Sequence, residues 1–419
     1  MMINMKNKNI ENQINEYMES YTNLWAFSGS IAVIKSGEVI FKKGYAYANI
    51  EHKVENVVET KYRLYSVTKQ FTAAAILMLE ERGLLKVEDS VRKYFPDWDE
   101  LDNRITIHHL LNHTSGLVNY TATDDFDRTK PQKPDFFKKY VSQPLEFEPG
   151  TQFNYCNTGY NILGMLIEEL SGVSYGQFLS ENIFLTLGML NTGIVDNKTI
   201  VEGMASGYYL NENDLIHCAY ANINSIDASG GMYSTALDML RWDKALNNDE
   251  LLSKKSIEKM NTPYEGNYGY GVDVNMHSDR RVVHHNGSYT GFLPAFYRYI
   301  DHDVAVVVLS NYGFTASDKL CMEIAKIIFE EKYDMPVKPP VYPLSHDMLE
   351  SYLGMYGEDG DPIELKREGE DLYLIIDNEY TFPVYPISEN VLHHTWIDEA
   401  YSIEKADDGQ LSIWGCKKN

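Results

Sequence analysis

The sequence predicts an α/β fold in which one antiparallel sheet is flanked by helices, with a small all-β domain at its C-terminal end. Strand-like segments lie at both ends of residues 1–333, and helical segments lie between them. Residues 334–343, DMPVKPPVYP, are rich in proline, which favours an extended spacer. We therefore predict two domains, 1–333 and 344–419, joined by a linker at 334–343.

The first predicted domain begins with an amphipathic helix at residues 10–26, followed by two strand-like segments. From Ser66 the sequence SVTKQFTAAAILMLEERG is apolar on nearly every side, which predicts a buried central helix that ends at Gly83. Further helices are predicted in ITIHHLLNHTSGL with Thr106 as N-cap, in TGYNILGMLIEELSG, after Ser234 or Thr235, and in DKLCMEIAKIIFEE. Residues 280–312 predict consecutive strands with tight turns, which complete the sheet.

The second predicted domain differs from the first in having short strand-like segments and few helical ones. Short strand-like segments follow one another closely in PIELKRE, LYLIID, YTFPVYP, VLHHTWI, AYSIEKA and QLSIWG. Many short strands at close spacing are typical of a barrel, so we expect residues 344–419 to form one.

The composition excludes several classes of function. The 61 acidic and 37 basic residues give a formal charge of −24, which repels phosphate backbones and anionic lipid, so we expect no nucleic-acid partner. The four cysteines lie far apart without a CxxC pair, which indicates reduced thiols rather than a metal site. The N-terminal segment lacks the apolar stretch of a signal peptide, and no later segment is long and apolar enough to span a membrane. We therefore expect a cytoplasmic protein.

Ser66 and Lys69 are the first candidates for chemistry. Their i, i+3 spacing on a helix places both side chains on one face. A serine hydroxyl needs a nearby base, and a lysine can serve when burial disfavours its charge. The chain also contains SxxK at 90–93 and 256–259, both in charged surroundings where the lysine should stay protonated, so Ser66 is favoured over these two rivals.

Tyr155 and Asn157 form the second candidate pair. Tyr-x-Asn occurs five times in a chain with 31 tyrosines, so the motif alone does not separate a catalytic tyrosine from a packed ring. Tyr155 differs from the others because it lies between a Pro149-Gly150 turn and an apolar helix. A phenol near a lysine ammonium ionises more easily, so Tyr155 is a candidate base.

His285, Gly287 and Ser288 form the third candidate group. His-x-Gly occurs once, within a strand-like segment. A glycine in a strand allows a ligand or another backbone to approach closely, and the N–H of Ser288 would then face an oxyanion. A lone histidine is more often structural, so the interpretation depends on all three motifs occurring together in this order.

The three motifs, with the phrases that surround them, resemble the superfamily of class C β-lactamases, DD-peptidases and related esterases. The resemblance covers most of residues 25–330 and includes YSVTKQFTAAAILMLEERGLLKVEDSV, ITIHHLLNHTSGL, FEPGTQFNYCNTGYNILGMLIE, ASGGMYSTALDMLRW and HHNGSYTGF. It implies the β-lactamase/transpeptidase-like fold and a penicillin-recognising serine hydrolase that needs no metal or cofactor. Residues 344–419 resemble the lipocalin-like C-terminal domains of some relatives.

The resemblance also implies a role for each site residue. Ser66 is the nucleophile that forms the acyl-enzyme, and Lys69 and Tyr155 share the transfer of its proton. Asn157 orients Lys69 and the substrate amide, and the N–H groups of Ser66 and Ser288 form the oxyanion hole. His285 and Gly287 stand where relatives carry a Lys-Thr-Gly strand.

The histidine at position 285 is the departure that bears on the substrate. Lysine offers a permanent cation for a substrate carboxylate, whereas histidine is about half charged near pH 6.5. Relatives with histidine here include DD-peptidases and D-amino-acid-specific peptidases, so a D-stereospecific, DD-carboxypeptidase-like peptidase is the first expectation. The alternatives are a carboxylesterase or weak β-lactamase that uses the same site, or a catalytically inactive scaffold protein. The C-terminal domain is expected to cap the site, limit substrate size or mediate assembly into a homo-oligomer.

Overall fold

The first domain of the computed structural model is built on one six-stranded sheet. The described residues are 2–123, 126–130, 134–223, 227–357, 362–376, 380–406 and 409–418. The sheet is antiparallel in the order β10-β11-β12-β13-β1-β2, so strands from both ends of the domain are neighbours. Its strands are β1 (Gly29–Lys35), β2 (Glu38–Tyr45), β10 (Asp273–His277), β11 (Arg280–Asn286), β12 (Leu293–Tyr299) and β13 (Val304–Ser310).

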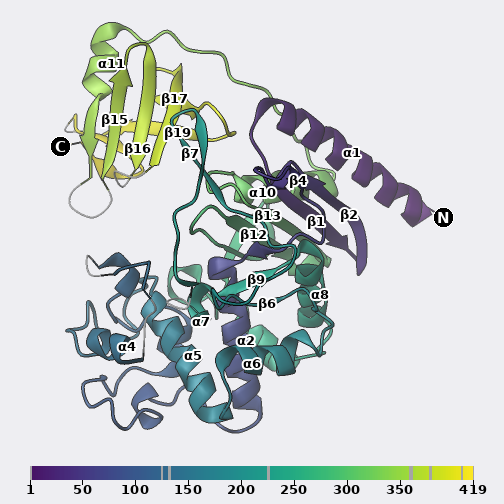
Figure 1. Cartoon of the computed structure of the whole chain (residues 1–419), viewed down its shortest axis with the longest axis vertical. Coiled ribbons are helices and arrows are strands. Elements are labelled where there is room, and N and C mark those ends of the chain that lie inside the picture. Colours follow the sequence, from purple (N-terminus) through teal and green to yellow (C-terminus); the bar gives the residue numbers. More distant parts are fainter. Residues whose placement is uncertain are drawn as a thin grey trace.

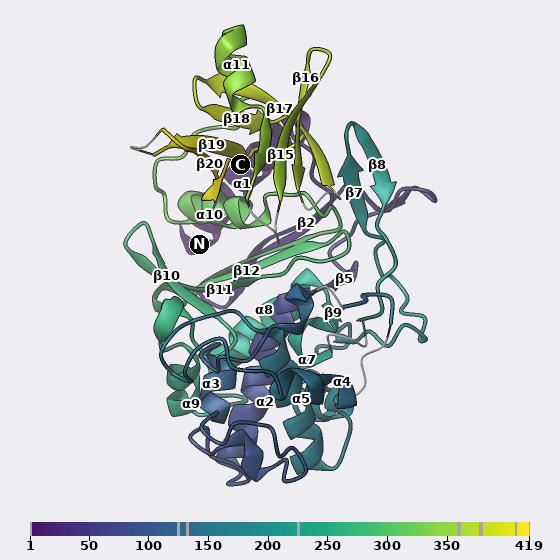
Figure 2. The ribbon, with the colours of Figure 1, turned by 90° about the vertical axis from the view of Figure 1, so that its left-hand side faces the viewer.

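Helices cover both faces of this sheet, as Figure 2 shows. One face packs on α1 (Met2–Leu24) and α10 (Ser317–Ile328), and the other packs on α2 (Lys69–Glu81) and α8 (Ala236–Asn247). Strand β13, VAVVVLS, is buried along its whole length because alternate side chains enter the two cores. The predicted antiparallel sheet flanked by helices is therefore confirmed.

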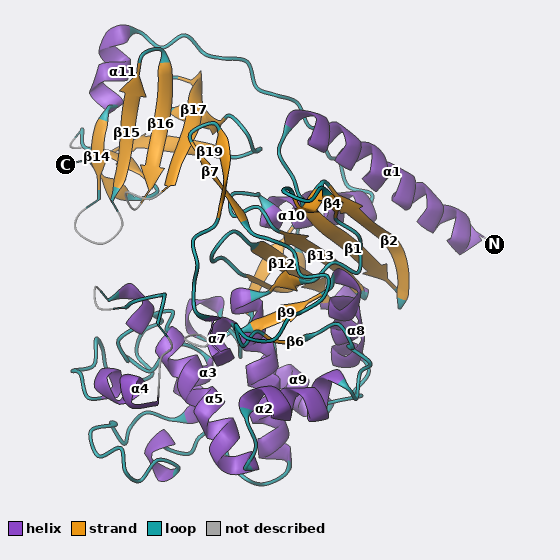
Figure 3. Ribbon diagram, viewed as in Figure 1, coloured by secondary structure: helices purple, strands orange, loops and turns teal. Residues whose placement is uncertain are grey.

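The remaining helices lie around α2, away from the sheet (Figure 3). They are α3 (Ile107–Leu111), α4 (Pro134–Val141), α5 (Asn157–Ser171), α6 (Tyr175–Leu179), α7 (Asp227–Gly230) and α9 (Lys254–Met260). The small strands are β3 (Tyr47–Asn49), β4 (Val54–Glu55), β5 (Tyr62–Arg63), β6 (Gly193–Ile194), β7 (Tyr208–Asn211), β8 (Asp214–His217) and β9 (Met232–Ser234). No helix in the described ranges combines the length and apolar character needed to cross a bilayer.

Several local predictions hold, and two need correction. Thr106 caps α3 through a capping box, the Thr235 side chain caps α8, and Gly83 follows the end of α2 with a φ of 74°. The first helix begins at Met2 rather than at residue 10. The predicted helix from Ser66 starts instead with a 3-10 turn, Tyr65–Thr68, and the α-helix begins at Lys69.

The C-terminal part is an eight-stranded antiparallel sheet that closes almost completely on itself (Figure 1). After α11 (His346–Tyr352) its strands are β14 (Gly354–Tyr356), β15 (Ile363–Glu368), β16 (Asp371–Ile376), β17 (Tyr380–Ser388), β18 (Val391–His394), β19 (Ala400–Lys405), β20 (Leu411–Ile413) and β21 (Cys416–Lys417). The Gly357 N–H donates to the Lys417 carbonyl over 2.7 Å, which joins the first and last strands. The predicted all-β barrel is confirmed, whereas the domain limits at 333 and 344 remain a prediction.

The hairpin of β7 and β8 links the two parts. The Glu212 N–H at its tip donates to the Thr381 carbonyl over 2.9 Å, and the rings of Tyr209 and Tyr380 lie 4.7 Å apart. Nothing in the hydrophobic pattern of the sequence predicted this contact.

Candidate active site

Ser66 lies in a strained turn at the start of the central helix. Tyr65, the residue before it, has a φ of 44°, a conformation that bulky residues rarely adopt. Such strain costs about 1–3 kcal/mol and persists only where surrounding contacts hold it. Here the Tyr65 hydroxyl forms a hydrogen bond with the Thr290 hydroxyl, and its ring packs edge-on against Tyr289. The loop between β11 and β12 therefore holds the turn that carries Ser66.

Lys69 is fully buried, and its hydrogen-bond partners among the described residues are all neutral. Its Nζ lies 3.2 Å from Ser66 Oγ, 2.8 Å from Asn157 Oδ1 and 2.8 Å from the Ser229 carbonyl oxygen. Burial holds the pKa of Lys69 well below its usual range. A neutral amine has two N–H donors and one lone pair. The two carbonyl oxygens take the donors, which leaves the lone pair for the Ser66 hydroxyl.

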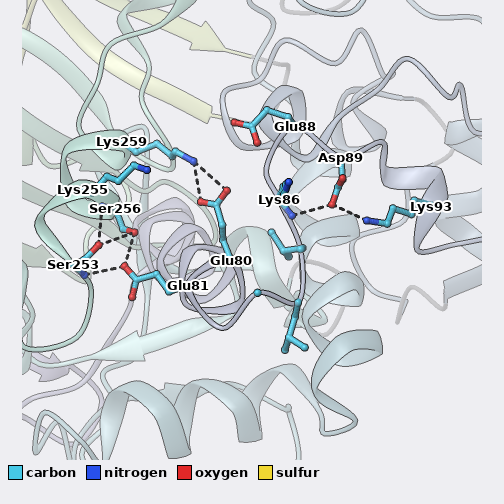
Figure 4. A pocket seen from close by; sticks show the side chains of 13 residues that line it. Glu80, Glu81, Lys86, Glu88, Asp89, Lys93, Ser253, Lys255, Ser256 and Lys259 are labelled. Atoms are coloured by element: carbon cyan, nitrogen blue, oxygen red, sulfur yellow. Dashed lines mark hydrogen bonds and ion pairs between the residues drawn. The ribbon is translucent and has the colours of Figure 1, made fainter.

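The SxxK sequences at 90–93 and 256–259 show the contrast, because their lysines are paired with carboxylates. Lys259 lies 2.9 Å from Glu80, and the Ser256 hydroxyl donates to Glu81 (Figure 4). Lys93 lies 3.0 Å from Asp89 in the same pocket, at the opposite end of α2 from Ser66. Both lysines therefore meet a carboxylate, whereas Lys69 meets neutral oxygens.

Tyr155 lies beside Lys69, at the entrance to α5. The Nζ of Lys69 is 4.7 Å from the centre of the Tyr155 ring. The Tyr155 hydroxyl is buried, and among the described residues it has no hydrogen-bond partner. Burial raises the pKa of Tyr155, although the nearby Ser66 hydroxyl opposes the rise. The expectation of an easily ionised phenol is therefore reversed. Burial disfavours the phenolate, and Lys69, whose own pKa is lowered, offers it little positive charge.

Asn157 is fixed by a second layer of hydrogen bonds that the sequence did not reveal. Its side-chain Nδ2 donates to Thr121 Oγ1 over 3.0 Å, so its Oδ1 must face Lys69. Its backbone N–H donates to Asn119 Oδ1 over 3.1 Å, and the Thr121 hydroxyl donates to the same oxygen. Cys156, between Tyr155 and Asn157, instead donates its thiol to the Leu117 carbonyl. Burial raises the pKa of that thiol to about 11, so Cys156 is a spectator.

Gly287 allows the strand β11 to approach the Ser66 turn. A Cβ at this position would lie 2.4 Å from the Leu64 carbonyl oxygen and 3.2 Å from the Ser66 nitrogen. Close backbone contact therefore requires glycine here, although Gly287 lies one residue beyond the end of β11 rather than inside the strand. Ser66 and Ser288 line the same pocket.

His285 is buried behind the reacting groups rather than exposed to a substrate. Its side chain is 4% exposed, its Nδ1 lies 2.6 Å from the Asn286 carbonyl oxygen, and its Nε2 lies 2.9 Å from the Tyr268 hydroxyl. Nδ1 therefore carries the proton and Nε2 accepts from Tyr268. Burial lowers the pKa of His285 to about 3, so the ring is neutral at pH 7 and lacks the partial charge that an ordinary histidine carries near pH 6.5.

The pocket beside Ser66 has a volume of about 270 Å³. Its described lining residues are Tyr65, Ser66, Thr121, Phe126, Asn157, Ser229, Gly230, Ser288 and Tyr289. Three separate parts of the chain thus line the pocket, and they contribute Ser66, Asn157 and Ser288. Within the described ranges, no group of three His, Cys, Asp or Glu residues is placed to hold a metal ion.

Comparisons with known proteins agree with this geometry. The beta-lactamase family profile matches residues 11–323. Penicillin-binding protein 4* of Bacillus subtilis (strain 168) is 31% identical over 393 residues, which cover 87% of each chain. The octameric penicillin-binding protein homologue from Pyrococcus abyssi has a TM-score of 0.67 at 26% identity and covers 98% of both chains. The D-amino acid amidase from Ochrobactrum anthropi SV3 shares the fold, with a TM-score of 0.68 at 22% identity over 77% of this chain and 99% of its own.

Proposed function

Because the chain belongs to the beta-lactamase family of serine hydrolases, we propose that it cleaves small D-residue peptides and amides through an acyl-enzyme on Ser66. The proposal depends on Lys69, a buried amine beside Ser66 whose hydrogen-bond partners in the described part of the chain are neutral. A scaffold protein without catalysis has no need for such a desolvated lysine, since burial of an amine is costly. The fold shared with a D-amino acid amidase is consistent with D-residue substrates.

The proposed acylation step uses the protons carried by Ser66 and Tyr155 and the lone pair of Lys69. The Ser66 Oγ attacks the carbonyl carbon while its proton moves to the lone pair of Lys69. The N–H groups of Ser66 and Ser288 stabilise the negative charge on the carbonyl oxygen. Tyr155 keeps its proton because burial raises its pKa, so it donates that proton to the departing nitrogen as the carbon–nitrogen bond breaks. The Lys69 ammonium then returns a proton to the phenolate.

Deacylation uses the same groups in the opposite direction. Water attacks the ester carbon of the acyl-enzyme and gives a proton to Lys69, and Ser66 recovers its proton as the carbon–oxygen bond breaks. The Asn157 amide, held by Thr121, keeps the Lys69 Nζ in place through both steps.

The test is intact-protein mass spectrometry after long incubation with benzylpenicillin. We expect one persistent adduct on the wild type and on Ser256→Ala, a matched variant of a rival SxxK sequence, but none on Ser66→Ala. Consumption of the penicillin without an adduct would indicate a β-lactamase instead. If neither an adduct nor consumption of penicillin is seen, the hydrolysis of D- and L-phenylalanine amides is measured instead. The proposal is refuted if Ser66 is not needed for turnover of either amide, or if neither is turned over.

We also propose that the chain assembles into a homo-oligomer. The Pyrococcus abyssi homologue, which aligns over nearly the whole chain, is described as octameric. A monomeric mass in solution by light scattering would contradict this proposal.

A further inference from the structure

A substrate that ends in a free carboxylate needs a cation near Ser66, and His285 does not supply one. Both ring nitrogens of His285 are engaged, Nδ1 with the Asn286 carbonyl and Nε2 with the Tyr268 hydroxyl. An approaching carboxylate finds no free N–H on this ring. Burial lowers the pKa of His285 to about 3, so the ring carries no charge at pH 7.

Two further basic side chains among the described residues, Lys69 and Arg63, are engaged with other groups. Lys69 gives its two available donors to Asn157 and Ser229 and must be neutral to accept the Ser66 proton. Arg63 points its guanidinium at the Tyr65 hydroxyl, 3.4 Å away, and at the Phe292 ring, 6.0 Å away. Arg63 is not among the described residues that line the pocket.

The walls of the pocket suit an uncharged group. The described lining residues include three aromatic side chains, Tyr65, Phe126 and Tyr289, and no ionised side chain. Aromatic faces bury apolar acyl groups well, whereas a carboxylate buried without a partner loses its hydration at a large cost. The formal charge of −24 on the whole chain further repels an anionic substrate.

We propose that the site selects acyl donors that carry no negative charge near the scissile bond, such as D-aminoacyl amides and esters with an aromatic side chain, over peptides with a free C-terminal carboxylate. This inference rests on the proposed acyl-enzyme at Ser66. It separates the chain from a carboxypeptidase, which must bind the terminal carboxylate, and narrows the substrates to those of an amidase, endopeptidase or esterase.

The test compares two substrates that differ in one charge. N-acetyl-D-phenylalanyl-D-alanine and its C-terminal amide are incubated with the wild type and with Ser66→Ala, and kcat/KM is measured by chromatography of the products. We expect kcat/KM to be at least about tenfold higher for the amide, and activity to be absent in Ser66→Ala. Equal rates, or a faster reaction of the free acid, would overturn the inference while leaving the proposed acyl-enzyme intact.

A second pair serves if neither peptide is cleaved. The neutral ester p-nitrophenyl butyrate and the anionic monoester p-nitrophenyl succinate have acyl chains of similar length, and the same order of rates is expected. Ser66-dependent turnover of the succinate at the rate of the butyrate refutes the inference. If no substrate of either pair shows Ser66-dependent turnover, both the inference and the proposed function fail.

Phe126→Lys places a cation in the pocket wall without touching the groups that move protons. The preference for the neutral substrate should fall about tenfold in this variant and stay unchanged in the matched variant Phe126→Leu. Thermal unfolding of both variants shows whether the fold is kept. An unchanged preference in a folded Phe126→Lys would show that the charge of this pocket does not select the substrate.

Discussion

Replacing Gly287 with alanine tests whether the contact between β11 and the Ser66 turn forms the oxyanion site. The added methyl would lie 2.4 Å from the Leu64 carbonyl oxygen, whereas ordinary contacts start near 3.4 Å. The two segments must therefore separate by about 1 Å. A displacement of this size costs roughly 10²-fold in rate, and loss of an oxyanion donor costs ~10²–10³-fold. We expect kcat for a neutral nitrophenyl ester to fall by about 10²-fold in Gly287→Ala.

The control is Gly159→Ala, in which the new methyl meets Leu110 at an ordinary 3.4 Å. This variant should keep kcat because its methyl touches neither Ser66 nor Ser288. Stopped-flow measurement of nitrophenol release gives the acylation rate, and thermal unfolding shows that each variant is folded. Wild-type acylation by a folded Gly287→Ala would refute the reasoning, because the oxyanion site would then tolerate the separation of the two segments.

Three further predictions follow from the protonation states. Lys69→Met should lower kcat by ~10²–10⁴-fold, the range expected for loss of a general base. Lys259→Met should retain activity because Lys259 is paired with Glu80, and equal losses of kcat in the two variants would contradict this distinction. Tyr155→Phe should lower kcat for amides yet leave the free energy of unfolding unchanged or higher, because the buried hydroxyl has no partner among the described residues. Urea unfolding measures this free energy, and a clear destabilisation would count against the prediction. Burial lowers the pKa of His394 in the barrel to about 3, whereas its ordinary pKa is 6.5. As the pH falls below 6.5, the ring takes up a proton in the unfolded state but not in the folded state, so the folded state loses stability. The free energy of unfolding of the wild type relative to His394→Asn should therefore decrease between pH 7 and pH 4, and a constant difference would contradict the shift.

Periodicity and capping explain how much of the fold the sequence could predict. The buried helix α2, the helix α10 and the caps at Thr106 and Thr235 follow from local patterns that the structure retains. The 3-10 turn at Ser66 does not, because the left-handed Tyr65 is held by Thr290, far away in the chain. The contact between the β7–β8 hairpin and the barrel also depends on residues that only tertiary structure brings together.

The candidate site shows the same division. Motif spacing identified Ser66, Lys69, Tyr155, Asn157, His285 and Gly287, and the structure brings these residues together. Thr121, Ser229 and Tyr268 were missed because each acts through a single hydrogen bond from a loop or a helix end, and no periodic pattern marks such a bond. The sequence ASGG around Ser229 predicted a turn and belongs to a phrase that carries the family resemblance, but neither observation gave Ser229 a role in the site.

Charge is the property that motif spacing predicts least well. Ser66–Lys69 and Ser256–Lys259 have identical spacing, yet one lysine meets two carbonyl oxygens and the other meets a carboxylate. Burial among these neutral oxygens holds the pKa of Lys69 well below its usual range, so Ser66 has a base beside it. The same reasoning applies at His285, where a ring expected to carry a partial charge is made neutral by burial and by the Tyr268 hydroxyl. The position where the resemblance implied a substrate-binding cation thus holds a buried, neutral ring, which is why we propose a neutral substrate for this site.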